Sequence, residues 1–396
     1  MIGKELLKTF FTGTRYAADS GGAAGPSDSV SEKRKLKPVL DGDWWLIGPS
    51  PDFTGLLPAE YKNIRMPNPD SPEGKRFMTR ALEAGVTKET LDNNLEMFKK
   101  HALNRDEPVD HHIFRGPDGT WHLWGCVRST PVGRVLYHWK SDSLTDGPWQ
   151  QTREMIRCNM DVGESIRSFG GEECIQSPYF IVENGTYYMF YGGCSTGMDK
   201  EGNPVEARGP GLPSGPRAEG QICLMTSSDG ENWVRHKNAD GTSRVFIGPG
   251  MARDPCLIKV DGLWHIYCAG NEGDPFMGGG CFARTSKDLI NWSDYKTVHR
   301  DASHGGRMSW SHECPHVVSR GGYLYLFRTE NYYDALTHVY RSEDPMDFGV
   351  DTAEKFVCTI GTGAPEIYEV DGKEYVSSNH DPALGTQMCR LKWVAE

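Results

Sequence analysis

A fourteen-residue unit recurs four times after residue 170, and this repeat restricts the fold more than any other feature of the sequence. Each copy opens on a residue followed by proline, runs as a short apolar strand, turns at a glycine and returns as a strand rich in aromatic residues. The copies are SPYFIVENGTYYMF from Ser177, DPCLIKVDGLWHIY from Asp254, CPHVVSRGGYLYLF from Cys314 and APEIYEVDGKEYVS from Ala364. Because glycine supplies the positive φ of a tight reversal, each copy is predicted to be a β-hairpin.

A fifth copy, DHHIFRGPDGTWHLW from Asp110, has one extra turn residue and His111 in place of the proline. After each of the first four hairpins, a short step of serine and acid leads to an aromatic residue, at Trp149, Trp233, Trp292 and Phe348. Repeated units of about four strands are typical of propeller blades. The sequence therefore predicts an all-β fold, a five-bladed β-propeller. Its last unit is short, so a strand around residues 44–47 is expected to complete the ring.

Two stretches of different character precede the repeats. Residues 20–35 are small, polar and charged and offer little apolar surface to bury, so residues 1–40 are predicted to be a flexible tail or linker. Apolar residues at helical spacing follow, with a first helix ending at Gly85 and a second beginning at Thr87. A helical hairpin is thus expected in an N-terminal extension, residues 41–105, before a propeller domain over residues 106–396.

The composition excludes several classes of partner. The net charge of −11 would repel a phosphate backbone, so no nucleic-acid partner is expected. No apolar segment has the length of a membrane span or of a signal peptide, which predicts a soluble protein without a membrane partner. Cytoplasmic, periplasmic and secreted locations stay open, because a signal could have been removed. The 11 cysteines form no C-x-x-C pair and are expected to be buried free thiols.

Carboxylates occur at the hairpin openings of three of the five units, at Asp110, Asp254 and Glu313. The innermost strand of each propeller blade lines the central axis, so these openings are expected to converge at one end of a funnel. Glycosidic cleavage needs a carboxylic acid to protonate the leaving oxygen and a carboxylate to act as base or nucleophile. A turn cap is the alternative role for each acid alone. Three acids in equivalent places favour a catalytic site.

From about Asp110 to its end, the chain resembles the five-bladed glycoside hydrolases of families 43, 32 and 117. The run from Arg253 to Pro255 resembles the R-D-P motif of family 32, and the run from Glu313 to Pro315 resembles its E-C-P motif. The resemblance to family 43 implies that Asp110 is the base, that the aspartate of the third blade raises the pKa of the acid, and that Glu313 is the acid. The N-D-P-N-G motif of family 32 is absent, so retaining chemistry is not implied.

Family 117 offers another fit. It resembles this chain in the helical extension, in a D-P-C-L run like that from Asp254, in a His-Glu pair like His312-Glu313 and in a P-E pair like Pro365-Glu366. Its histidine is the proposed acid, so this resemblance makes His312 the alternative proton donor. The position of the following proline favours Glu313. The helical arm of that family is swapped between subunits, which implies a homodimer through the N-terminal helices; a cap on the side of the propeller is the alternative.

Further residues near the mouth of the funnel are candidates for substrate binding. Trp310 is expected to stack on a sugar face or to pack on its own blade, and Arg307 to hold a hydroxyl or acid group. Arg253 either pairs with a neighbouring carboxylate or binds substrate. Position alone adds Gln176, Ser177 and Glu366. No cofactor is expected to be required, although the resemblance to family 43 implies a structural divalent cation in the axial channel that the sequence does not locate.

The sequence thus predicts a glycosidase, a polysaccharide-degrading hydrolase of carbohydrate metabolism that acts in exo mode on a plant or algal oligosaccharide. The resemblance implies that this substrate is a furanoside or an anhydro-sugar. One alternative is a non-catalytic carbohydrate-binding propeller, which would need no trio of acids. Another is a glycoside phosphorylase, for which Arg253, Arg307 and His312 are candidate phosphate ligands.

Overall fold

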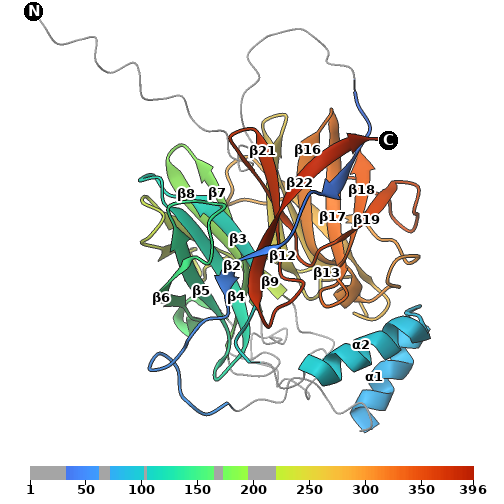
Figure 1. Cartoon of the computed structure of the whole chain (residues 1–396), viewed down its shortest axis with the longest axis horizontal. Coiled ribbons are helices and arrows are strands. Elements are labelled where there is room, and N and C mark those ends of the chain that lie inside the picture. Colours follow the sequence, from blue (N-terminus) through green and yellow to red (C-terminus); the bar gives the residue numbers. More distant parts are fainter. Residues whose placement is uncertain (1–32, 62–71, 102–104, 165–172, 195–219) are drawn as a thin grey trace, which may run out of the picture.

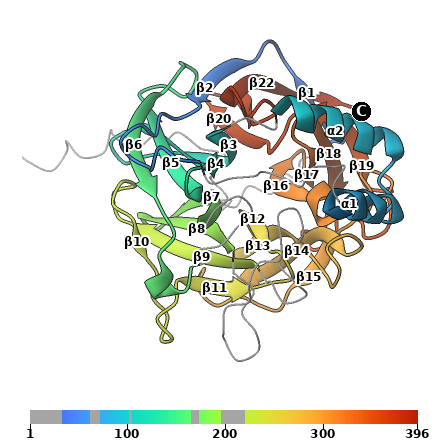
Figure 2. The same cartoon turned by 90° about the horizontal axis from the view of Figure 1, so that it is seen from below.

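The computed structural model describes residues 33–61, 72–101, 105–164, 173–194 and 220–396. Antiparallel strands make up most of this part of the chain, and they stand in groups around one central axis, as Figure 2 shows. This is the arrangement of a β-propeller, as the repeat predicts. No helix in the described ranges is long and apolar enough to cross a membrane.

The first two strand groups share one sheet. The first consists of β3 (Glu107–Arg115), β4 (Trp121–Thr130), β5 (Gly133–Ser141) and β6 (Gln150–Ile156). The second consists of β7 (Glu173–Glu183), β8 (Thr186–Cys194) and β9 (Gly220–Ser227), with β10 (Val234–Arg235) and β11 (Arg244–Ile247) on β9. A short parallel pairing of β5 with β7 joins the two groups.

Two four-stranded sheets follow. One contains β12 (Arg253–Val260), β13 (Leu263–Asn271), β14 (Gly279–Ser286) and β15 (Lys296–His299). The other contains β16 (Glu313–Arg320), β17 (Tyr323–Asn331), β18 (Leu336–Ser342) and β19 (Phe356–Gly361). The 3₁₀ turns η1 (Met160–Val162) and η2 (Ser309–Ser311) lie in the connections, and η2 leads directly into β16.

The last sheet joins the two ends of the described chain. It contains β20 (Glu366–Val370), β21 (Lys373–Ser378) and β22 (Gly385–Ala395), with β1 (Leu36–Leu40) and β2 (Trp45–Pro49) both paired to β22. The strand expected around residues 44–47 is β2. The predicted tail ended at residue 40, whereas β1 already begins at Leu36; this boundary is corrected, because Leu36 and Leu40 pack in the core against Ile360 and Ile367. Residues 1–32 lie outside the described ranges.

The hairpin turns of the four fourteen-residue copies have one geometry. Each is a two-residue turn with positive φ at both positions, at Asn184-Gly185, Asp261-Gly262, Gly321-Gly322 and Asp371-Gly372. Such turns match the right-handed twist of the flanking strands. The turn residues therefore set the pairing of each inner strand with its neighbour, and with it the position of the residues that open the hairpin.

The helical hairpin consists of α1 (Pro72–Glu83) and α2 (Lys88–His101), which lie against the lower end of the strand ring in Figure 1. Ala81 and Leu91 pack on Phe276 and Met308 from the loops of the propeller. The backbone N–H of Arg307 also donates to the carbonyl of Ala84, at 3.0 Å. These apolar residues are thus buried against the propeller loops of the same chain, and the side cap stays an alternative. The homodimer through these helices stays a prediction.

Gly306 lies in close contact with the turn between α1 and α2, and this contact leads to a prediction about stability. Gly306 has a φ of 74°, and a Cβ there would lie 2.9 Å from the backbone nitrogen of Val86. We expect Gly306→Ala to cost roughly 2–4 kcal/mol, because positive φ and overpacking add. Gly185→Ala is the matched control, since its φ is 77° and nothing lies within 4 Å of its added Cβ. Equal falls in Tm for both variants would contradict the tight packing at Gly306.

Candidate active site

The inner strands share one irregularity near their starts. Positive φ occurs at the residue that opens each repeat: Asp110 (36°), Ser177 (52°), Asp254 (56°), Cys314 (50°) and Ala364 (49°). In β3, β7, β12 and β16 the pairing register also shifts at this residue, as at a β-bulge. Bulges re-aim side chains next to active sites, and strained backbone persists where the surrounding structure holds it. The repeat thus places its opening residues around the axis.

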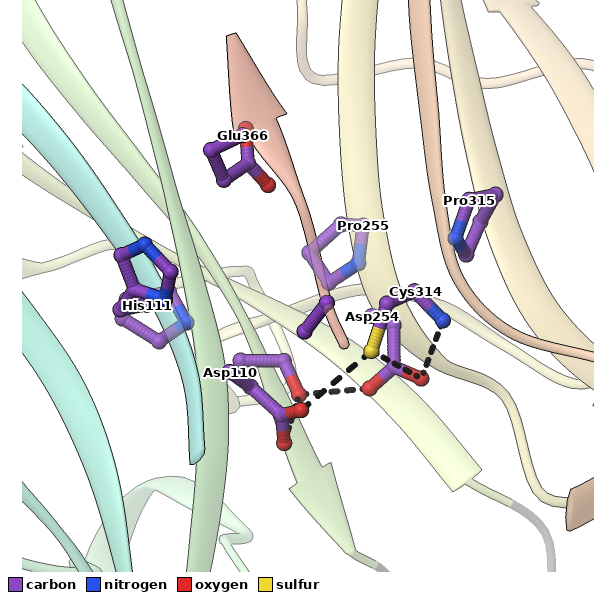
Figure 3. A pocket seen from close by; sticks show the side chains of 10 residues that line it. Asp110, His111, Asp254, Pro255, Cys314, Pro315 and Glu366 are labelled. Carbon is purple, nitrogen blue, oxygen red and sulfur yellow. Dashed lines mark hydrogen bonds between the residues drawn. The ribbon is translucent and has the colours of Figure 1, made fainter. Parts of the chain in front are cut away.

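These opening residues and their successors line one cavity (Figure 3). Its lining consists of Asp110, His111, Ser177, Pro178, Asp254, Pro255, Cys314, Pro315, Ala364 and Glu366. Four of the predicted site residues are thereby brought together, namely Asp110, Ser177, Asp254 and Glu366. The empty space is about 270 Å³, part of which is open to solvent.

The carboxylates of Asp110 and Asp254 lie side by side in this cavity. One carboxylate oxygen of Asp110, one of Asp254 and Sγ of Cys314 lie within 4.8 Å of one another. The hydroxyl oxygen of Ser177 lies 2.6 Å from Oδ1 of Asp254 and 3.1 Å from Oδ2 of Asp110. The backbone N–H of Cys314 donates to Oδ2 of Asp254, at 3.1 Å. Burial raises the pKa of Asp254, and the negative charge of Asp110 raises it further.

Two contacts on Asp110 involve residues that the sequence did not single out as site residues. The O–H of Tyr332 donates to Oδ1 of Asp110, and Sγ of Cys314 lies 3.3 Å from the same oxygen. Tyr332 belongs to the loop between β17 and β18, outside the repeat, so no periodic signal in the sequence pointed to it. Cys314 occupies the repeat-opening position of the fourth unit, and the equivalence with Asp110 and Asp254 was the signal that could have identified it.

Glu313 lies one residue before this ring of opening residues and does not line the cavity. Its Oε1 accepts a hydrogen bond from Nη2 of Arg253, at 2.9 Å, and its side chain is 21% exposed. Burial raises the pKa of Glu313 to about 7, with the charges of Asp254 and Asp110 adding to this effect and Arg253 opposing it. A carboxyl group with this pKa exists in both protonation states near neutral pH, as a general acid must.

Arg253 is held by the protein on several sides. Besides Glu313, its guanidinium donates to the hydroxyl of Ser309 at 3.0 Å, to the carbonyl of Ser309 at 3.1 Å and to the carbonyl of Met251 at 3.1 Å. Its Nε lies 3.6 Å from Asp254. Of the two roles that the sequence allowed, the structure shows the ion pair. Arg253 links the third and fourth strand groups and holds Glu313 in place.

His312 does not reach the cavity. Its ring is fully buried, and Nδ1 lies 3.1 Å from the carbonyl oxygen of Met308. Its Nε2 accepts the backbone N–H of Asp301, at 3.4 Å. Burial and the nearby guanidinium of Arg328 hold the pKa of His312 well below its usual range. The ring is therefore a neutral imidazole whose two nitrogens are bonded to backbone groups.

Three other candidate residues also lie away from the cavity. Gln176 is buried and accepts a hydrogen bond from Arg134. Trp310 packs against Phe77 of α1 and against Phe276, with ring centroids 5.9 and 5.2 Å apart. Trp310 is partly buried and packs on the helical hairpin and on the loop after β13 rather than on its own blade, and its stacking on a sugar stays a prediction. Arg307 is exposed, and its backbone binds the helix turn.

The structural cation implied by the resemblance stays a prediction, and two buried histidines near Glu366 use their ring nitrogens within the protein. Nδ1 of His316 lies 2.8 Å from Oε2 of Glu366, and Nε2 of His112 lies 3.6 Å from the same oxygen. The other nitrogens accept backbone N–H groups, from Ile367 to His316 at 3.2 Å and from Phe180 to His112 at 3.3 Å. Each ring thus uses its lone pair on an amide, and a metal ligand needs that lone pair.

No protein-family model and no curated protein matches the sequence. Among solved structures, the chain is similar to a Bombyx mori family 32 β-fructofuranosidase, with 18% identity, a TM-score of 0.49 and coverage of 76% of this chain but only 66% of that one. An exo-1,5-α-L-arabinanase from a bovine ruminal metagenomic library has 18% identity, a TM-score of 0.47 and coverage of 72% and 93%.

A family 43 β-xylosidase/α-arabinofuranosidase from a compost microbial metagenome has 14% identity, a TM-score of 0.44 and coverage of 73% of this chain and 91% of that one. The solved structures similar to this chain thus include glycoside hydrolases of families 32 and 43.

Proposed function

We propose that this chain is a glycoside hydrolase built on a five-bladed propeller, which cleaves a terminal sugar from an oligosaccharide by carboxylate acid–base catalysis. The observation that carries the proposal is the set of three acids. Two buried carboxylates, Asp110 and Asp254, lie side by side in the axial cavity, and a third, Glu313, lies beside them with a raised pKa. This set contains the acid and the base that glycosidic cleavage requires.

Each acid has a distinct role in this proposal. Asp110 is the base or nucleophile, because its carboxylate lines the cavity. Asp254 lies between Asp110 and Arg253, and its negative charge contributes to the raised pKa of Glu313. Glu313 donates the proton to the leaving oxygen, since its carboxyl group is largely protonated below pH about 7. Arg253 orients Glu313 through their hydrogen bond.

The proposed substrate is an oligosaccharide of plant or algal origin that is attacked from its end. The cavity is lined by residues from five strand groups at the propeller axis, and attack from the chain end is proposed from the resemblance of the motifs. The furanoside or anhydro-sugar character of that unit rests on the resemblance of the motifs. No cofactor enters the proposal.

The two alternatives have less support. A phosphorylase needs cationic side chains that are available to phosphate in the cavity. The guanidinium of Arg253 is engaged by protein groups, His312 is buried, and Arg307 is exposed but does not line the cavity. A binding module would gain nothing from a largely buried glutamate whose pKa is near 7. A panel of 4-nitrophenyl furanosides and pyranosides and of plant and algal oligosaccharides, with and without phosphate, separates the three. We expect free sugar without phosphate; sugar 1-phosphate or binding without release would contradict hydrolysis.

The pH dependence of the rate follows from the protonation state of Glu313. We expect kcat/KM to fall as the pH rises through about 7, because the carboxyl group with this raised pKa loses the proton that it must donate. The profile is measured on a substrate with a poor leaving group. With a 4-nitrophenyl glycoside, whose leaving group needs little protonation, the basic limb should flatten. A profile that stays level to pH 9 on both substrates would exclude Glu313 as the acid.

A further inference from the structure

Tyr332 comes from a loop outside the repeat, yet its hydroxyl group reaches the first carboxylate of the cavity. The O–H donates to Oδ1 of Asp110, and the same hydroxyl oxygen lies within hydrogen-bond distance of Sγ of Cys314. The residue is 8% exposed, and its ring packs in the core cluster that contains Val109 and Ile175. The hydroxyl group is therefore held in a defined place by the packing of the ring.

The donors around Asp110 distinguish its two oxygens. An ionised carboxylate only accepts hydrogen bonds, so each contact must come from a donor. Oδ1 faces two donors, the O–H of Tyr332 and the S–H of Cys314. Oδ2 faces the hydroxyl of Ser177 at 3.1 Å, but this hydroxyl has one proton and lies closer to Asp254, at 2.6 Å. The hydroxyl proton of Ser177 therefore lies in the shorter contact, to Asp254. Oδ2 of Asp110 then accepts no hydrogen bond from Ser177.

We propose that Tyr332 is a positioning residue that anchors Oδ1 of Asp110 and thereby makes Oδ2 the reacting oxygen. This inference deepens the proposed function and rests on the role of Asp110 as base or nucleophile. Asp110 has a backbone φ of 36° and lies beside a second buried carboxylate, so a strong donor is needed to hold its side chain in one orientation. Burial and the charge of Asp110 raise the pKa of Tyr332 well above its usual value, so the phenol keeps its proton.

Tyr332→Phe removes the hydroxyl group and keeps the ring. On the 4-nitrophenyl glycoside that the wild type cleaves fastest, we expect kcat to fall by about 10- to 100-fold, because a displaced reacting group costs this much. KM should stay within about twofold, since the ring still fills its place in the core and no substrate contact is removed. A fall in kcat at constant KM is a split that a loosened fold alone would not cause.

Tyr333→Phe is the matched control, because it removes a tyrosine hydroxyl group from the next residue along the chain. The hydroxyl of Tyr333 accepts from Arg128, at 2.9 Å, and does not contact Asp110. We expect kcat of this variant to stay within about twofold of wild type, because the substitution lies outside the contacts of Asp110. A folded Tyr332→Phe variant with wild-type kcat would overturn the inference.

A measurement without substrate separates this inference from the proposed function. In NMR spectra of the protein with labelled tyrosine, we expect one slowly exchanging hydroxyl proton that is absent from Tyr332→Phe and shifted in Asp110→Asn. Its absence from the wild-type spectrum would overturn the inference, even if Tyr332→Phe failed to fold. Asp110→Asn could instead keep wild-type turnover while this proton is present in the wild type. The catalytic role of Asp110 would then be wrong. The contact with Tyr332 would be structural only, so the positioning role would also be overturned.

Discussion

Replacement of Glu313 with glutamine is expected to lower kcat/KM on an oligosaccharide by about 10²- to 10⁴-fold, the usual contribution of a general acid. Glutamine keeps the shape of the side chain and an oxygen for the hydrogen bond from Arg253, but it has no acidic proton. On a 4-nitrophenyl glycoside the loss should be much smaller, because this leaving group departs without protonation. The ratio of the two losses therefore identifies the proton donor.

His312→Asn is the comparison for that experiment, with the Tm of each variant measured alongside. The ring of His312 is buried and bonded to the backbone at both nitrogens, so we expect its replacement to lower Tm but to change kcat by less than about tenfold. If His312→Asn abolished turnover in a folded protein while Glu313→Gln spared it, the histidine would be the acid and our assignment would be wrong.

Asp110→Asn is expected to lower kcat by at least about 10³-fold, because an amide acts neither as a nucleophile nor as a base. The amide oxygen can still accept the hydrogen bond from Tyr332, so the fold around the cavity should be kept. The substitution also removes one of two neighbouring buried charges, and we expect Tm not to fall. Steady-state kinetics and thermal denaturation measure the two effects.

Asp261→Asn is the matched control for Asp110→Asn. Asp261 has a φ of 49°, close to the 36° of Asp110, but it lies in the exposed turn between β12 and β13. Asparagine tolerates this backbone conformation as well as aspartate does. Wild-type kcat is expected in this variant, and a loss of activity equal to that of Asp110→Asn would mean that the effect comes from the backbone and not from the carboxylate.

The position of the cavity could be predicted because the sequence encodes it locally. The glycine turns set the pairing of each inner hairpin, and the residue before proline marks the bulge at its start. From the sequence alone, these two signals place Ser177 and Asp254 in one ring, and the alignment of the fifth copy, which lacks the proline, adds Asp110. The offset of Glu313 by one residue was also visible in the sequence, and in the structure this side chain accepts a hydrogen bond from Arg253.

The contacts that hold these residues could not be predicted in the same way. Tyr332 reaches Asp110 across 222 residues of sequence, from a loop that has no counterpart in the repeat pattern. Trp310 precedes the fourth motif and was expected at the mouth of the funnel, but it packs against Phe77 of α1. Such contacts depend on how distant loops meet in space, and neither periodicity nor local spacing reports on that.

The most direct test of the proposed hydrolysis is turnover in ¹⁸O-labelled water. Wild-type enzyme is incubated with the oligosaccharide or aryl glycoside that it cleaves, and the products are analysed by mass spectrometry beside those of Asp110→Asn and Glu313→Gln. We predict one ¹⁸O atom in the released sugar, none in the leaving alcohol, and little product from either variant. Label in the alcohol, or equal turnover by wild type and both variants, would contradict the proposed reaction.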